Sequence, residues 1–238
     1  MISHLIWLPA FGGIENRPLN TDDAFTLSSH TFSLSTGLLY SWNRKQSDKA
    51  DIIVIDVGYG LTDYFEITVD IPFLSLSKNV GLEAQMIKNL SVRPEFMLLD
   101  ERAYLPAFSI ANTFEFQSSA KPNYYPSIQA TKDFDFLTCH LNIGYAFIRD
   151  KQEGNDDSGL FYSFGFESDL TKKLTIVGEL VGSTNSYSSF EQEPKEILLG
   201  LIFNVEDGLA LDLGIGKAVS GANPDPDIRI TFGGTWYF

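Results

Sequence analysis

The chain has 238 residues, 44% of them hydrophobic, and a formal net charge of -14 at pH 7. This acidic balance excludes a surface built to bind nucleic acid, because such binding depends mainly on basic side chains that neutralise phosphates. The single cysteine, Cys139, excludes an intramolecular disulfide. No cluster of cysteine and histidine has the spacing of a zinc site, so the sequence predicts neither a metal ion nor another cofactor.

The first twenty residues form a segment of their own. MISHLIWLPAFGG carries a short apolar patch without a preceding lysine or arginine, so it is too small for a whole secretory signal. It is either the remnant of such a signal or, if the rest of the chain forms a membrane barrel, a segment that lies in the lumen of that barrel or on its periplasmic side. No window reaches ~18 consecutive apolar residues, so no transmembrane helix is predicted. We assign residues 21–238 to one domain, because all-β domains of this size are often undivided.

From about residue 31 onward, apolar and polar residues alternate with period two. The pattern predicts about twelve strands of ~9–11 residues, the length that crosses a bilayer at a tilt of ~45°. The connections between these strands alternate in length. In chain order, the short ones are residues 60–63, 100–104, 132–135, 168–173 and 205–208, and the long ones are 41–51, 76–89, 117–125, 149–159, 184–195 and 217–227.

The alternation is cleanest in the second half of the chain. In residues 137–147, one face is apolar and the opposite face is small or polar. A soluble β-sandwich would bury its apolar face, and nothing would make its connections alternate in length. An outer-membrane barrel requires short periplasmic turns, longer external loops, an apolar exterior and a polar lumen. The sequence therefore predicts an all-β fold, a closed antiparallel transmembrane β-barrel of about twelve strands, located in the bacterial outer membrane.

The final stretch, DIRITFGGTWYF, follows the same alternation. Its apolar half is expected to face lipid, with Trp236 and Phe238 at the periplasmic interface, where barrels carry an aromatic girdle. The strand resembles the C-terminal signature by which bacterial outer-membrane barrels are recognised for assembly. Trp236, Tyr237 and Phe238 are thus the predicted interface and assembly residues. The expected partners are outer-membrane lipid, the assembly machinery and a small solute of unknown identity.

Three stretches carry a resemblance to a known family: RPLNTDDAFTL, HLNIGYAF and GLTDYFEITVDIPF. They resemble the family named for the MetA pathway of phenol degradation, a set of outer-membrane transporters of Gram-negative bacteria. The resemblance runs from about Arg17 to Phe238, and Phe25 stands where the family usually has glycine. It implies passage of small organic, aromatic compounds and no catalytic residues.

Successive side chains of a strand point to opposite faces, so odd and even positions face different sides of the wall; we call this the parity of a residue. Parity points many ionisable side chains into the lumen, and the acids among them outnumber the bases. In one interpretation they form an electronegative conduit that favours cations or neutral solutes. In the other they form a salt-bridged polar interior that fills a narrow barrel, because buried charges need partners. The predicted lumen-lining residues are Asp56, Glu66, Asp70, Arg93, Glu95, Glu115, His140, Asn142, Glu167, Lys173, Glu179, Glu196, Asp212 and Arg229.

The expected function is a passive channel or transporter for small hydrophobic or aromatic molecules. The alternatives are a structural or accessory barrel with a filled lumen, and a membrane-embedded lipid hydrolase. The hydrolase would need a Ser-His pair on the membrane side, whereas parity turns His140 inward. No catalytic residue is predicted, and a hydrogen-bonding role is expected for His140 and Asn142.

Overall fold

The computed structural model describes residues 19, 21–42, 49–77, 85–86, 89–117, 121–147, 158–184, 195–220 and 228–238. Within these ranges the regular structure is β-strand, and no helix has the length and hydrophobicity needed to span a membrane. The strands are β1 (Phe32–Trp42), β2 (Lys49–Thr62), β3 (Phe65–Ser77), β4 (Gln85–Met86), β5 (Asn89–Leu99), β6 (Ala107–Gln117), β7 (Asn123–Asp133), β8 (Thr138–Phe147), β9 (Ser158–Thr171), β10 (Leu174–Ser183), β11 (Lys195–Glu206), β12 (Leu209–Ser220) and β13 (Ile228–Tyr237).

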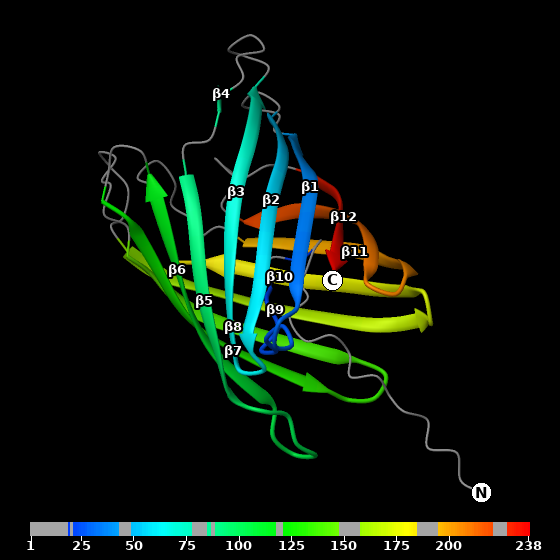
Figure 1. Cartoon of the computed structure of the whole chain (residues 1–238). Coiled ribbons are helices and arrows are strands. Elements are labelled where there is room, and N and C mark those ends of the chain that lie inside the picture. Colours follow the sequence, from blue (N-terminus) through cyan, green and yellow to red (C-terminus); the bar gives the residue numbers. More distant parts are fainter. Residues whose placement is uncertain are drawn as a thin grey trace, which may run out of the picture.

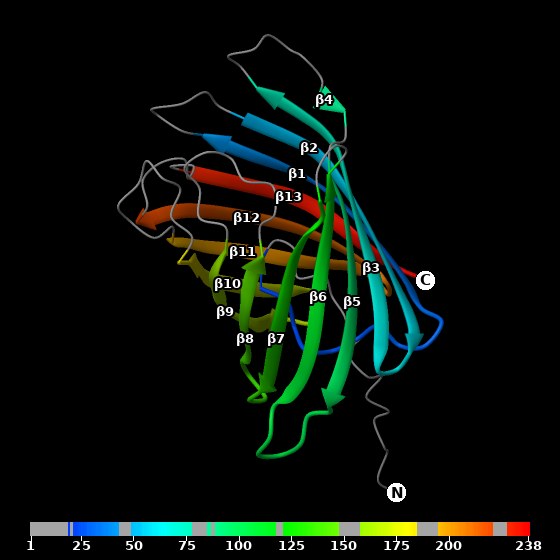
Figure 2. The same cartoon turned by 90° about the vertical axis from the view of Figure 1, so that its left-hand side faces the viewer.

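Twelve of these strands close into an antiparallel barrel. Each pairs with its neighbours along the chain, β3 pairs directly with β5, and β1 pairs with both β2 and β13. Figures 1 and 2 show the strands winding around one interior, with β13 lying between β12 and β1. The two-residue β4 pairs only with β3, opposite Leu74 and Ser75 near the end of that strand. The predicted fold class and strand number are confirmed.

The period-two pattern has the predicted orientation. Leu199 and Leu213 are 52% and 50% exposed on the outside, whereas Leu198 and Asp212, each one residue away, are 0% and 5% exposed. An apolar exterior and a closed ring suit lipid, because closure leaves no sheet edge with unpaired backbone groups. The outer surface is therefore the membrane-facing surface.

The short connections lie together at one end of the barrel. The tight turn between β11 and β12 uses Gly208 at a φ of 80°, a conformation that glycine adopts without a steric penalty. Most residues of the predicted long connections are outside the described ranges. The chain also closes on itself at the short-turn end: Phe32 N–H donates to the carbonyl of Phe238 at 2.8 Å, and Phe238 N–H donates back to the carbonyl of Phe32 at 3.0 Å.

Aromatic rings gather at this end. Trp236 and Phe238 are exposed on the outside with ring centroids 5.3 Å apart, and Phe238 also stacks on Phe32 at 5.9 Å. Tyr237, between them, is half-buried. Rings at this position match the aromatic girdle expected where a barrel meets the membrane interface.

Candidate functional site

The candidate functional site is the lumen of the barrel and the chain segment that crosses it. Nearly all of the predicted lumen residues lie on the inward face. Lys173 lies instead in the exposed turn between β9 and β10, because β9 runs on to Thr171 and only two residues remain to reverse the chain. Buried in the lumen are Glu66, Glu95, His140, Asn142, Glu179 and Asp212, and half-buried are Asp56, Asp70, Arg93, Glu115, Glu167, Glu196 and Arg229.

Residues 21–27, which we call the lumen segment, cross the interior before β1 begins (Figure 2). At one end, Thr21 donates from its N–H and its Oγ1 to Glu179 Oε2 on β10, at 2.9 and 2.8 Å. At the other end, Leu27 N–H donates to Glu66 Oε2 on β3 at 2.6 Å. The domain expected to begin at residue 21 thus starts inside the barrel, and the wall starts only at β1. Residues 1–18 and 20 are outside the described ranges.

The middle of the lumen segment is held by two more wall strands. Ala24 N–H donates to Thr131 Oγ1 on β7 at 2.8 Å. With its amide oriented to satisfy both contacts, Asn142 on β8 donates to the Asp22 carbonyl at 2.8 Å and accepts from the Asp22 N–H at 2.7 Å. Wall side chains therefore bind the segment largely through its backbone.

An ion-pair cluster joins the segment to β5. Arg93 Nη1 lies 2.9 Å from Asp22 Oδ2, and Arg93 Nη2 pairs with Glu95. Ser109 on β6 donates to the other oxygen of the Glu95 carboxylate. The arginine thus neutralises one carboxylate of the wall and one of the segment, as buried charges require.

Asp23 is a buried acid of the lumen segment. Its side chain is buried, and its Oδ1 accepts the Phe25 N–H at 2.7 Å. Burial raises the pKa of Asp23 well above its ordinary value of 3.8; the Phe25 hydrogen bond opposes this shift, and the nearby carboxylates Glu95, Glu167 and Glu66 add to it. The docked segment therefore favours protonation of Asp23.

Two glycines let the segment approach the wall. A Cβ on Gly60 of β2 would collide with the carbonyl oxygens of Leu27 and Ser28, and a Cβ on Gly165 of β9 would lie 3.1 Å from Thr21 Cβ. With these contacts, the segment touches β2, β3, β5, β7, β8, β9 and β10. The lumen segment is therefore packed against the inner wall of the barrel along its length.

The opposite side of the lumen carries a second cationic centre. Arg229 Nη2 on β13 lies 2.7 Å from Glu196 Oε1 and 4.0 Å from Glu179 Oε1. Gly216 on β12 leaves room for Glu196, because a Cβ there would collide with the Glu196 carboxylate. Glu179 thus lies between an arginine on one side and the lumen segment on the other.

His140 belongs to the hydrogen-bonded interior. Its Nδ1 lies 3.0 Å from Thr131 Oγ1, and its Nε2 lies 3.5 Å from Glu167 Oε1. Thr131 Oγ1 accepts the Ala24 N–H and also bonds His140 Nδ1, and a hydroxyl can donate or accept this second bond. The residue is 2% exposed and faces away from lipid.

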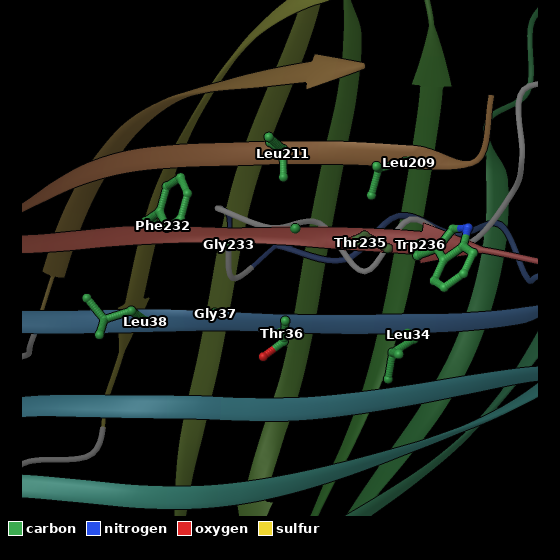
Figure 3. A pocket seen from close by; sticks show the side chains of 11 residues that line it. Leu34, Thr36, Gly37, Leu38, Leu209, Leu211, Phe232, Gly233, Thr235 and Trp236 are labelled. Atoms are coloured by element: carbon green, nitrogen blue, oxygen red, sulfur yellow. The ribbon is translucent and has the colours of Figure 1, made fainter. Parts of the chain in front are cut away.

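The outer wall carries a groove of about 450 Å³ where the first and last strands meet. We call it the seam groove (Figure 3). The groove is deep at Gly234 on β13, because a glycine has no side chain to fill the space. Thr36 on β1 and Leu211 on β12 lie opposite this glycine. The rim consists of the apolar side chains Leu34, Leu38, Leu209, Leu211, Phe232 and Trp236.

Comparison with known proteins establishes the fold. No protein-family model matches the sequence, and no curated protein matches it. Among solved structures, the COG4313 outer membrane channel from Pseudomonas putida F1 is similar with a TM-score of 0.71 and 10% identity, over 92% of this chain and 100% of that chain. The KdgM porin gives 0.62 and 14% identity, and the NanC porin 0.61 and 8%, each over 87% of this chain and 99% of the other. The chain is thus an outer-membrane β-barrel, and its place is the bacterial outer membrane.

Proposed function

We propose that this protein is a passive outer-membrane channel for small solutes, with a lumen narrowed by the lumen segment. The observation that carries the proposal is a polar interior within an apolar exterior. A segment crosses this interior and donates hydrogen bonds to side chains of the wall. The similar structures named above, described as porins or an outer membrane channel, support the same class.

The charge of the interior favours cations and neutral solutes over anions. Among the described residues, carboxylates from many strands face the lumen, whereas Arg93 and Arg229 are the arginines of its ion pairs. Glu167 on β9, Glu179 on β10 and Asp212 on β12 come from one side of the wall, where β11 separates β10 from β12. A pore lined by excess acids concentrates cations and repels anions.

We further propose that the solutes are hydrophobic or aromatic, as the resemblance to the MetA-pathway family implies. The Thr21-Asp22-Asp23-Ala24 motif of that resemblance lies in the lumen segment, and three of its four residues contact the wall. This placement gives the motif a physical role, which is to anchor the segment across the lumen.

A second candidate function is a structural or accessory barrel with a filled lumen. The ion pairs Arg93–Asp22 and Arg229–Glu196 favour it, because they occupy interior space with side chains rather than water. A lipid hydrolase is not supported by the contacts of His140, whose partners are Thr131 and Glu167 on the inward face.

Conductance in a planar lipid bilayer separates these functions. A channel gives small, steady conductance with a weak cation preference, which falls as salt rises because charges are screened over ~10 Å at 0.1 M. Changing Glu167 and Asp212 to their amides reduces the preference further. If neither the wild type nor a variant with a weakened lumen segment conducts, the filled barrel is correct. Swelling of liposomes in neutral aromatic and aliphatic solutes then tests the solute class.

A further inference from the structure

A second groove, of about 620 Å³, lies on the outer wall over β5 to β9. We call it the proline groove. Its rim is exposed and apolar, with Ile110 at 40% and Ile128 at 56% exposure, so it opens toward the membrane. Its lining residues include Pro94, Phe96, Ile110, Asn112, Pro126 and Ile128.

The backbone ladder is interrupted beneath this groove. Pairing of β5 with β6 runs to Val92↔Phe114 and resumes at Glu95↔Ala111, and the unpaired stretch places Pro94 opposite Asn112. Pairing of β7 with β8 stops at Tyr124↔Phe147 and resumes at Ser127↔Gly144. This second gap places Pro126 opposite Tyr145.

Each gap leaves a carbonyl group without its usual donor. Proline has no N–H, so it cannot donate to the residue opposite it in the ladder. The carbonyl groups of Asn112 and Tyr145 therefore receive no ladder hydrogen bond from Pro94 and Pro126. In a membrane, water is not there to replace such a bond.

The Asn112 side chain adds a third acceptor at the same place. It lies on the same face of β6 as Ile110 and pairs in register with Pro126. Its Oδ1 is buried and has no hydrogen-bond partner among the described residues. The groove thus combines an apolar rim with one unpartnered amide oxygen at Asn112, beside two ladder carbonyl groups that lack a proline donor, in a region where unsatisfied acceptors are costly.

We propose that the proline groove binds an apolar alcohol from the membrane, with its hydroxyl group at Asn112 and its apolar body along Phe96, Ile110 and Ile128. A hydroxyl suits this floor, because it donates to a carbonyl oxygen and accepts from the Asn112 amide N–H. An ether of the same shape keeps the apolar contacts and cannot donate. The site lies outside the lumen and does not depend on whether the barrel conducts.

The test uses the whole protein in lipid nanodiscs and two probes, 1-decanol with a terminal fluorine and its methyl ether. Binding is followed by fluorine NMR, with protein-free nanodiscs as the reference for partitioning into lipid. We expect the wild type to bind the alcohol about tenfold more tightly than the ether, the factor that one good hydrogen bond provides.

Asn112→Leu should abolish this difference by weakening only the alcohol. It removes a polar group from the lipid-facing wall, so folding is expected to be preserved, and a heat-induced shift on gel electrophoresis checks it. The matched control is Thr36→Val in the seam groove, which also removes a lipid-facing hydrogen-bonding group and should leave the difference intact. Equal binding of alcohol and ether by the wild type would overturn the proposal, as would unchanged alcohol binding by Asn112→Leu; the groove then holds lipid acyl chains.

Discussion

Replacement of Glu179 should release the lumen segment. One oxygen of this buried carboxylate accepts both the N–H and the hydroxyl of Thr21, at 2.9 and 2.8 Å. Hydrogen bonds to a charged group contribute ~1.5–3 kcal/mol each, so the two together hold this end by ~3–6 kcal/mol. Water bonds the Thr21 donors when the lumen segment leaves the wall, so we use the lower end of this range. We expect Glu179→Leu to weaken docking by ~3 kcal/mol, about 100-fold in the opening equilibrium.

Glu179→Gln should have a smaller effect, because the amide oxygen still accepts both bonds while the charge is lost. Charge-assisted hydrogen bonds are roughly twice as strong as neutral ones, so we expect a loss of ~1.5 kcal/mol, about tenfold. In both variants Arg229 keeps Glu196 at 2.7 Å, which limits secondary damage to the wall.

Hydrogen exchange of the backbone amides in residues 21–27, read by mass spectrometry, measures the opening directly. Exchange should accelerate about 100-fold in Glu179→Leu and about tenfold in Glu179→Gln, since protection scales with the opening free energy. The control is Glu115→Gln, because the Glu115 carboxylate accepts from Tyr125 and Asn123 on β7. If the exchange rate in Glu179→Leu equals that of the wild type, Glu179 does not anchor the segment and our account of the lumen is wrong.

Three further predictions concern lipid contact, pH and assembly. Leu213→Arg places a charge in the membrane and should lower the unfolding free energy by ~2–4 kcal/mol in reversible urea unfolding in lipid, with much less effect from Leu213→Ala; equal losses would refute the assigned outer face. Because the pKa of Asp23 is raised when the segment is docked, the contribution of Asp23 to docking is largest at low pH and is lost as the pH rises above 3.8 toward that raised value. Asp23→Asn keeps the Oδ1 acceptor and should flatten this dependence in exchange measurements corrected for intrinsic rates; a wild-type pH profile in the variant would contradict it. We also propose that the outer-membrane assembly machinery recognises the last strand. Deletion of Phe238 removes both hydrogen bonds to Phe32 and should reduce the amount of heat-modifiable folded barrel in outer-membrane fractions. An undiminished amount would argue against this recognition.

The barrel could be predicted from the sequence because its rule is local. Each wall residue contacts either lipid or the lumen according to its parity, so Leu213 and Asp212 can be assigned without knowing their neighbours. The short turns could also be predicted from local sequence, because each is a short polar stretch between two alternating segments. Lys173 was misplaced because parity was extended through a turn, where the strand period no longer applies.

The lumen segment could not be predicted in this way. Residues 21–27 lack a strand or helix period, and each of their hydrogen bonds to the wall ends on a residue far away in sequence, such as Glu66, Thr131 or Glu179. Asp22 and Asp23 stood out only through a family resemblance. The sequence feature that indicates such a segment is the excess of lumen acids, because an interior so rich in carboxylates needs donors. The backbone N–H groups of Thr21 and Leu27 supply two of these donors.

The contacts of the lumen segment also impose an order on folding. Residues 21–27 precede in sequence every strand that they touch, and Thr21 reaches Glu179 across 158 residues. The surface that receives the segment is built from residues of seven strands, so it exists only after those strands have paired. Contacts between residues so distant in sequence form late, because the chain entropy of closing the intervening loop is lost before the contacts stabilise anything. The barrel therefore forms around an interior that is still open, and the lumen segment is the last part of this region to become ordered.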